Sequence, residues 1–226
     1  MYNLINPKVL ELAKRYEKSP VIRALVQLIP LGIGGAADAA LTTIISNIRE
    51  DRARTFFDEL AAQGLPLTEK EMQSEDFLHA YFATCKAALN TRRREKIRLF
   101  AGLLHNYASN PTEFEEFEEH LSVLDDLSYR EFQVLVILKQ YEEANPQRQE
   151  ENELKRANRF WDGFLAECAT KLKIPTEEIN GMLTRLNRTG LYQTIVGAYL
   201  DYSGDRGRLT PNFYRFIEKL NTANTE

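Results

Sequence analysis

Apolar side chains recur at helical spacing along most of the chain, separated by short polar segments. After Ser128, for example, Phe132, Leu135, Val136 and Leu138 form one broad apolar stripe when the segment is drawn as a helix. Such a stripe is typical of a helix that packs against a core. The pattern predicts helices over residues 7–17, 20–29, 36–63, 69–90, 92–108, 112–121, 128–144, 154–173, 176–189 and 211–221.

Three capping boxes mark the starts of predicted helices. In each box a Ser or Thr hydroxyl accepts a hydrogen bond from a free N–H of the first turn, and a Glu three residues later accepts one from the cap N–H. The pairs are Thr68 with Glu71, Thr112 with Glu115, and Ser128 with Glu131.

One segment has the composition of a sheet. Residues 191–204 are rich in Tyr, Ile and Val and are bounded by Gly190 and Gly204, which favours a strand. Residues 207–210 are the expected short partner strand. The chain is therefore predicted to be mainly helical with a single small β-hairpin.

The second half of the chain, residues 128–221, has the predicted order helix, helix, short turn, helix, hairpin, helix. We expect Thr176 to cap the third helix and Gly190 to end it in a left-handed conformation. Thr210 is the expected cap of the last helix, with Pro211 at its first position. The third helix carries a clean buried stripe of Ile179, Met182, Leu183 and Leu186.

This region resembles the winged helix-turn-helix domains of MarR-type regulators. Those domains have a helix-to-strand junction with the pattern "RL…GL", then a hairpin and an "LTP" helix start. The resemblance implies a winged-helix-like domain with one small β-hairpin (123–226), and the helical pattern before it predicts a helical bundle (1–122), so that the expected fold is mainly α. The matching residues are Arg185, Leu186, Gly190, Leu191, Leu209, Thr210 and Pro211.

The charges of this half argue against DNA as its main partner. A recognition helix places its first residues against bases and phosphates, but here those residues are Glu177 and Glu178. Residues 121–226 carry 14 basic and 16 acidic side chains, whereas DNA-binding domains usually have a positive excess. We therefore favour a protein-interaction or dimerisation module, with DNA binding as the alternative. The candidate DNA contacts are Arg185, Asn187, Arg188, Arg206 and Arg208.

Two charge blocks of opposite sign lie close together in the first half. Residues 112–126 contain seven acidic residues and no Lys or Arg. One hypothesis is a nucleic-acid or anionic-lipid patch beside a separate acidic docking face. We favour the simpler interpretation that the blocks lie on adjacent helices and neutralise each other, or are solvated faces. The basic block, within residues 86–100, consists of Arg92, Arg93, Arg94, Lys96 and Arg98.

The region 92–140 also resembles the helical abortive-infection proteins of bacterial phage defence, the alpha family among them. In that family a charged helix ends in a small-residue "LL" turn, and a serine cap opens the next helix. Phe100 stands where the family pattern has a tryptophan. The resemblance implies a bacterial host-defence or stress role. The matching residues are Glu95, Lys96, Leu103, Leu104 and Ser128.

One pair of residues is a candidate catalytic site. Arg98 and His105 are seven residues apart on one predicted helix, so their side chains share a face. The pair is similar to the Arg-x4–6-His motif of HEPN ribonucleases, which implies phosphate binding by Arg98 and acid–base chemistry by His105. Leu99 departs from the polar residue that usually follows the arginine in that family. We favour a surface arginine and a half-buried capping histidine.

Composition narrows the remaining chemistry. The net charge is −4 over 226 residues, so any attraction to nucleic acid must be local. Cys85 and Cys168 are far apart and have no metal-ligand spacing, which indicates reduced thiols in a cytoplasmic protein. Neither the three histidines nor any glycine-rich motif fits a known metal or phosphate site. We therefore expect no cofactor and no metal.

Residues 29–48 form an apolar, glycine-rich stretch that contains one acidic residue, Asp38. A transmembrane span is not expected, because Pro30 and the glycines interrupt the run and Asp38 ends it. The stretch is predicted to form a corner between two helices, with Asp38 in the first turn of the second helix, where a carboxylate complements the free N–H groups.

Three classes of function follow from the sequence. The first, which we favour, is a non-enzymatic helical protein that uses its winged-helix-like domain to bind a protein partner or a second copy of itself. The second is a DNA-binding transcriptional regulator. The third is a helical ribonuclease that uses Arg98 and His105.

Overall fold

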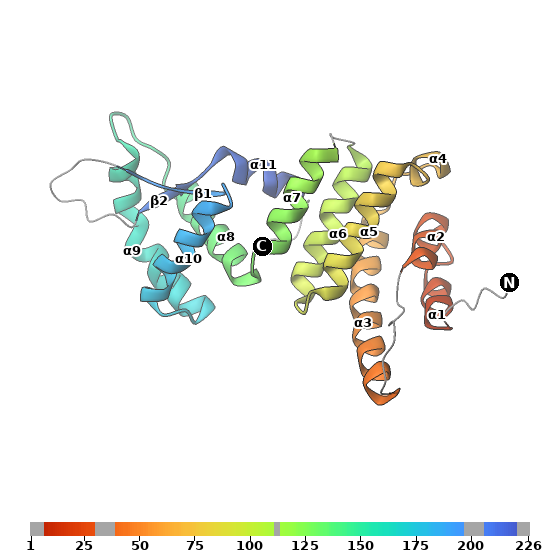
Figure 1. The fold of residues 1–226 in the computed structure, drawn as a ribbon. Helices are drawn as coiled ribbons and strands as arrows, with labels where there is room; N and C mark the ends of the chain where they lie inside the picture. The colour runs from red at the N-terminus through yellow and green to blue at the C-terminus, as the bar shows by residue number, and fades with distance from the viewer. Residues whose placement is uncertain (1–6, 30–38, 111–113, 197–205, 221–226) are drawn as a thin grey trace. The chain divides into compact units, whose positions relative to one another are not determined.

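The computed structural model describes residues 7–29, 39–110, 114–196 and 206–220. Within these residues the chain is mainly helical, with eleven helices and one two-stranded antiparallel sheet, which confirms the predicted fold class at this level (Figure 1). The chain separates into two compact units, each described by itself. Unit 1 comprises Met1–Asp125 with Glu218–Glu226, and unit 2 comprises Asp126–Ile217.

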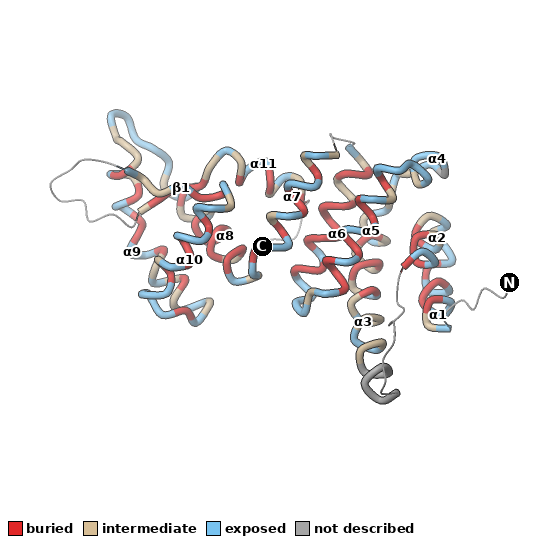
Figure 2. The backbone as a smooth tube through the Cα atoms, in the orientation of Figure 1, coloured by how far each residue is buried: buried red, intermediate tan, exposed pale blue. Residues whose placement is uncertain are grey.

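Unit 1 is a helical bundle built around one helix that is buried on nearly every side. That helix, α6, packs against α3 and α5, and burial runs around most of its circumference (Figure 2). Ile97, Phe100 and Leu104 are each fully buried. The helices of this part are α1 (Pro7–Arg15), α2 (Pro20–Leu28), α3 (Ala39–Gln63), α4 (Glu69–Met72), α5 (Glu75–Asn90), α6 (Arg94–Ser109) and α7 (Phe114–Asp126).

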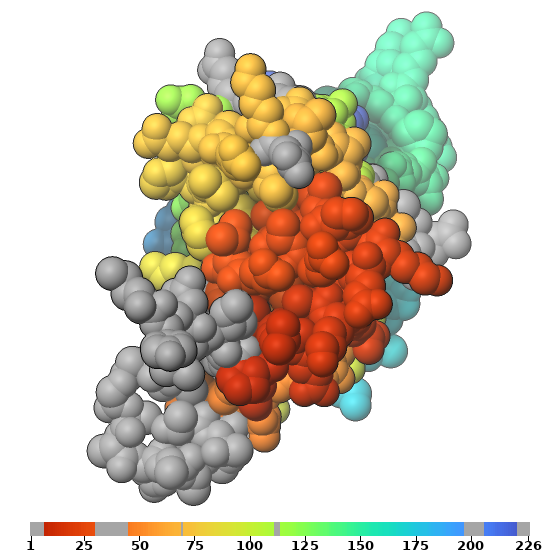
Figure 3. Space-filling view, turned by 90° about the vertical axis from the view of Figure 1, so that its right-hand side faces the viewer, coloured from red at the N-terminus to blue at the C-terminus, as the bar shows by residue number. Residues whose placement is uncertain are grey.

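The first two helices form a hairpin on one face of unit 1, the face turned to the viewer in Figure 3. Ile22, Leu25 and Val26 of α2 are fully buried. The hydroxyl of Tyr81 in α5 donates to the carbonyl of Leu25 at 2.5 Å, so the buried phenol is paired. The hairpin is thus held by apolar packing and by a hydrogen bond across 56 residues of sequence.

Two helix predictions in this part are wrong in extent. The predicted helix 69–90 is divided into α4 and α5, because the backbone of Ser74 is extended and its hydroxyl caps α5 by accepting from the N–H of Phe77 at 3.3 Å. The predicted helix 112–121 continues to Asp126, because Leu124 extends the buried stripe of α7 by another turn.

Two of the three capping boxes lie within the described residues, and both are present. Thr68 and Glu71 exchange hydrogen bonds of 2.8 and 3.3 Å, and Ser128 and Glu131 exchange bonds of 2.9 and 3.2 Å. Thr112 lies outside the described residues. Asp38 does too, so its predicted place near a helix N-terminus stays a prediction.

Unit 2 is arranged around one helix that buries a broad side of its surface (Figure 2). Val134, Leu135 and Leu138 of α8 are fully buried, and α8 packs against α9 and β2. The side chain of Asn152 caps α9 by accepting from the N–H of Lys155 at 2.9 Å. The elements are α8 (Tyr129–Ala144), α9 (Glu153–Leu172), α10 (Thr176–Arg188), β1 (Tyr192–Thr194), β2 (Gly207–Leu209) and α11 (Pro211–Lys219).

A three-residue turn joins α9 to α10. Lys173 ends α9 in the left-handed conformation, with φ at 53°, and Pro175 precedes the first residue of α10. The prediction of Thr176 as the cap is wrong: Thr176 is the first helical residue, because the extended backbone of Pro175 already occupies the capping position. The predicted stripe from Ile179 to Leu186 is buried as expected.

The hairpin and the helix that follows it agree with the local signals in the sequence. Gly190 has φ at 73°, the left-handed region predicted for it. Strand β1 pairs antiparallel with β2, with Gln193 opposite Arg208. The hydroxyl of Thr210 accepts from the N–H of Phe213 at 3.3 Å and so caps α11, which starts at Pro211. Residues 197–204 of the predicted strand lie outside the described part.

The ring of Tyr192 leaves no space for a side chain at Gly207 inside the hairpin, which makes a substitution there informative. A Cβ atom at this position would lie 2.1 Å from the ring of Tyr192, which is 2% exposed. We expect Gly207→Ala to lower the free energy of unfolding by about 1–3 kcal/mol, because the buried ring has no room to move.

Gly181→Ala is the matched control, measured by urea denaturation of both variants. A Cβ atom there meets nothing within 4 Å, and the position lies inside α10. This change should raise the free energy of unfolding by about 0.5–1 kcal/mol, because alanine loses less backbone entropy in a helix. Equal stability of the two variants would contradict the assignment of the Gly207 contact.

Candidate functional site

The first candidate surface is the exposed side of α10, where sequence predicted DNA contacts. Arg185 is already engaged within the protein, because its Nε donates to Oε1 of Glu131 at 2.8 Å. The other carboxylate oxygen of Glu131 accepts from the N–H of Ser128 in the capping box. Arg185 therefore ties α10 to the start of α8 across 54 residues of sequence.

The charge of Glu131 depends on this bond. Burial raises the pKa of the Glu131 carboxyl, but hydrogen bonds from Arg185 and Ser128 outweigh burial and bring the pKa below its ordinary value. The carboxylate thus stays charged inside the protein because its two partners remain in place. Removing one partner would leave a buried charge, which is strongly unfavourable.

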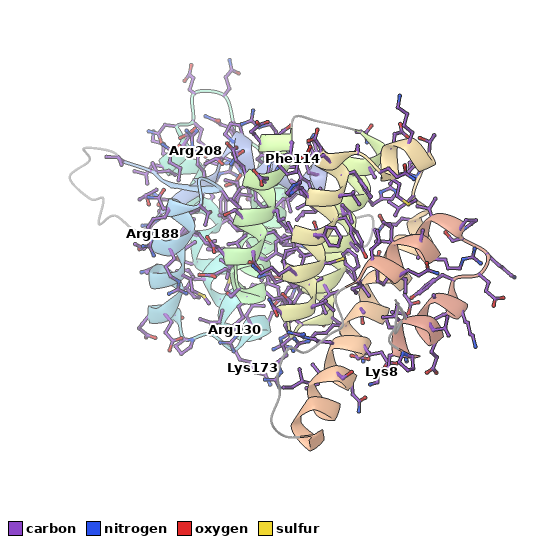
Figure 4. All side chains as sticks on the ribbon, turned by 45° about the vertical axis from the view of Figure 1, so that its right-hand side comes forward. Lys8, Phe114, Arg130, Lys173, Arg188 and Arg208 are labelled. Carbon is purple, nitrogen blue, oxygen red and sulfur yellow. The ribbon has the colours of Figure 1, made fainter. Side chains whose placement is uncertain are left out.

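The rest of the α10 surface carries mixed charge. Asn187 and Arg188 are exposed at the end of the helix, and Glu177 and Glu178 are exposed at its start. Figure 4 labels Arg188 on α10 and Arg208 on β2, two of the predicted contacts. The helix end that would meet phosphate in a DNA complex is therefore acidic and open to solvent.

The side chain of Arg208 and the backbone of Arg206 form contacts within the hairpin region. Arg208 contacts the carboxylate of Glu153, at the start of α9, and donates to the side chain of Gln193 on the opposite strand at 3.2 Å. The carbonyl of Arg206 accepts from the N–H of Ile195 at 2.9 Å and extends the ladder beyond β1. The Arg206 side chain is half-buried.

A second candidate, which sequence reasoning missed, is centred on Glu142 near the end of α8. Its carboxylate is 5% exposed and accepts from the N–H of Leu209 in β2 at 2.9 Å and from the hydroxyl of Tyr214 in α11 at 3.1 Å. The guanidinium of Arg156 donates to the backbone carbonyl of Glu142 at 2.6 Å. One side chain thus joins α8, the hairpin and α11.

Burial raises the pKa of Glu142, and the hydrogen bond from Leu209 and the charge of Arg156 oppose that effect without cancelling it. The hollow beside Glu142 has room for little more than one water molecule, far less than a small-molecule site requires. Its lining includes Arg156, Phe160, Ile195 and Arg208. The cluster therefore has the character of a structural junction rather than a substrate pocket.

A sequence signal for this junction did exist. Glu142 follows Leu135 and Leu138 at seven and four residues, so an acidic side chain continues the apolar stripe of α8. A carboxylate on a buried stripe requires donors, and the sequence does not show which segments supply them.

The third candidate is the pair Arg98 and His105 on α6. Both side chains are on the side of α6 that packs against α3, but each has its own partner there. Arg98 lies 3.7 Å from the carboxylate of Glu59, and His105 contacts the backbone of Gly64. Burial lowers the pKa of His105, opposed by the Gly64 contact. These contacts secure the end of α3 to α6.

The basic block does not meet the acidic block in the way we expected. Arg94 forms an ion pair with Asp51 of α3 at 2.8 Å, and Arg98 pairs with Glu59 of the same helix. Lys96 reaches the acidic segment, but its ammonium donates to the backbone carbonyl of Asp125 at 2.7 Å. Neutralisation of one block by the other is therefore wrong, because α3 supplies the partners of these arginines. The exposed Glu115, Glu118 and Glu119 of α7 agree with the other interpretation, that of a solvated face.

The described residues contain no cluster of three or more His, Cys, Asp or Glu side chains placed to hold a metal ion. In the same part of the chain, no helix combines the length and the apolar character needed to cross a bilayer. The fold and its junctions thus define a mainly helical protein of two units with a small antiparallel sheet. Comparison with known protein families, with curated proteins and with solved structures found no match.

The Glu142 junction predicts a pH-dependent stability. A carboxyl whose folded pKa is raised stabilises the fold below its ordinary pKa of about 4.5, and that contribution is lost as pH rises through the folded pKa. Glu142→Gln removes this slope and keeps an acceptor. We therefore expect the free energy of unfolding of the variant, relative to the parent, to increase as pH rises above about 4.5.

Urea denaturation at a series of pH values measures this difference. Glu143→Gln, which removes one negative charge at the exposed neighbouring position, is the matched control for the change in net charge. Curves for parent and Glu142→Gln that stay parallel from acid to neutral pH would refute the assignment of the raised pKa.

Proposed function

We propose that this chain is a non-enzymatic interaction or assembly protein, and that unit 2 is a winged-helix module that binds protein rather than DNA. The order α8, α9, short turn, α10, β1, β2 supports the winged-helix assignment, since a helix-turn-helix followed by an antiparallel hairpin is the element order of that class. The resemblance to MarR-type domains at Gly190, Thr210 and Pro211 points the same way.

The observation that carries the proposal is that arginines predicted as DNA contacts form ion pairs within unit 2. Arg185 is held by Glu131 and Arg208 by Glu153, so two of the five predicted DNA contacts already serve as internal links. At the start of α10, Glu177 and Glu178 are exposed where a recognition helix meets phosphate. Two carboxylates beside a phosphate backbone repel it, whereas a protein partner can supply Lys or Arg to them.

The partner is a second copy of the chain or another protein. A helix surface with two exposed glutamates at its start and an exposed Asn and Arg at its end is ordinary for a polar interface rim. The resemblance of residues 92–140 to abortive-infection proteins suggests a bacterial defence or stress setting for that partner. The alternative is DNA binding through Asn187 and Arg188, and the experiment below distinguishes it from protein binding.

Fluorescence anisotropy with random duplex DNA tests the proposal on the full chain. We expect weak binding by the parent, with little change between about 50 and 200 mM salt, because few phosphates are contacted. Glu177→Gln combined with Glu178→Gln should raise the affinity several-fold, because it removes the repulsion. The matched control is Glu118→Gln with Glu119→Gln, an equal charge change on exposed positions of α7.

Sedimentation velocity of the same samples reads out self-association. A parent protein that binds duplex DNA tightly, with steep salt dependence that disappears in Arg188→Gln, would overturn the proposal in favour of a DNA-binding regulator. The proposal would also be contradicted if the protein is a monomer and cross-linking in its host cell captures no protein partner.

A further inference from the structure

Arginines from two distant segments meet at one corner of unit 1. Arg52 of α3 donates from Nη1 to the carbonyl of Leu89, at the end of α5, at 2.6 Å. Arg94, which follows Leu89 in the sequence at the start of α6, forms an ion pair of 2.8 Å with Asp51, the residue before Arg52 in α3. The turn between α5 and α6 is therefore fixed against the middle of α3 (Figure 1). We call this the arginine corner: Arg49, Arg52, Arg92, Arg93 and Arg94.

In the described part of the chain, Arg92, Arg93 and Arg94 outnumber the acidic side chains that pair with them. Asp51 is paired with Arg94, and Glu50 is shared between Lys8 at 3.1 Å and Arg54 at 3.2 Å. Within the described residues, Arg92 and Arg93 are exposed and form no ion pair. Burial lowers the pKa of Arg52, and so do the positive charges of Arg49 and Arg92, which are therefore close enough to repel it.

Repulsion between these arginines is a cost that an anionic ligand would remove. The folded chain brings Arg49 and Arg92 to the same side chain from 43 residues apart, so their proximity is imposed by the packing of α3 against α5 and α6. Guanidinium groups match the geometry of phosphate oxygens. A surface rich in phosphate therefore fits the corner better than a single carboxylate does.

The neighbourhood of the corner is aliphatic. Ile48 directly precedes Arg49, lies one turn before Arg52 and is 44% exposed. Ile45, three residues before Ile48 in the same helix, is half-buried. Basic side chains beside an exposed aliphatic side chain are a combination that binds the surface of an anionic bilayer.

We propose that the arginine corner, together with Ile48, binds the surface of a membrane that contains anionic phospholipid. Arg49, Arg92 and Arg93 contact lipid phosphates, and Ile48 enters the boundary between head groups and acyl chains. The corner is compact, and its exposed neighbour is aliphatic, which offers nothing for bases to stack on. These features favour a lipid surface over a nucleic acid, which prefers an extended basic groove with aromatic platforms.

Vesicle co-sedimentation of the full chain tests the proposal. One set of vesicles is phosphatidylcholine alone, and in the other about a third of the lipid is phosphatidylserine. We expect binding to the second set only. Arg49→Gln/Arg92→Gln/Arg93→Gln, which leaves the structural Arg52 in place, should weaken binding on the order of 100-fold, since each basic residue near the surface contributes several-fold. Ile48→Gln should weaken it about 5-fold or more.

The matched control is Arg130→Gln/Arg188→Gln/Arg215→Gln, the same charge change at exposed arginines of unit 2. It should bind anionic vesicles as the parent does. If the triple variant of the corner does not fold, judged by circular dichroism, Arg92→Gln/Arg93→Gln in the exposed turn replaces it, with an expected loss of at least 10-fold.

Three outcomes overturn the proposal. The parent fails to bind anionic vesicles, or the control loses as much binding as the corner variant, which would indicate unspecific attraction. The third is tight binding of single-stranded RNA through the same arginines with no binding to vesicles, which would make the corner a nucleic-acid surface. None of these outcomes depends on what unit 2 binds.

Discussion

In each unit one central helix buries charged side chains together with its apolar ones, and every buried charged group needs hydrogen-bond partners. In unit 1 the ammonium of Lys96 on α6 donates to the carbonyl of Asp125 and lies over the ring of Phe100. In unit 2, Glu131 and Glu142 of α8 are held by groups from α10, β2 and α11. The partners of these three side chains fix the positions of the surrounding elements.

This constraint also separates structural arginines from those that remain at the surface. In unit 2, Arg185 and Arg208 are engaged by Glu131 and Glu153, so residues that look like DNA contacts in the sequence stabilise the module instead. In unit 1 the opposite holds. Packing of α3 against α5 and α6 gathers arginines whose acidic neighbours already have partners. Within the described residues, Arg92 and Arg93 of unit 1 are thus exposed without an ion pair, whereas Arg185 and Arg208 of unit 2 are engaged inside the fold.

The two proposals assign different partners to the two units and rest on different contacts. A protein partner for unit 2 follows from the exposed glutamates at the start of α10, and a lipid surface for unit 1 follows from Arg49, Arg92 and Ile48. A chain with both properties would bring its protein partner to a membrane. The net charge of −4 is compatible with this arrangement, because local clusters and not the total charge decide such contacts at physiological salt.

The sequence by itself determined those features whose physics is local. The Ser128–Glu131 capping box, the left-handed Gly190, the cap at Thr210 and the buried stripe of α10 each depend on residues within one turn or one helix. The break at Ser74 was also local, but the longer apolar pattern concealed it. Only the tertiary structure decided the partners of the charges: Glu142 meets Leu209 across 67 residues, and Arg94 meets Asp51 across 43. Long-range packing chooses those pairs, and spacing along the chain does not encode it.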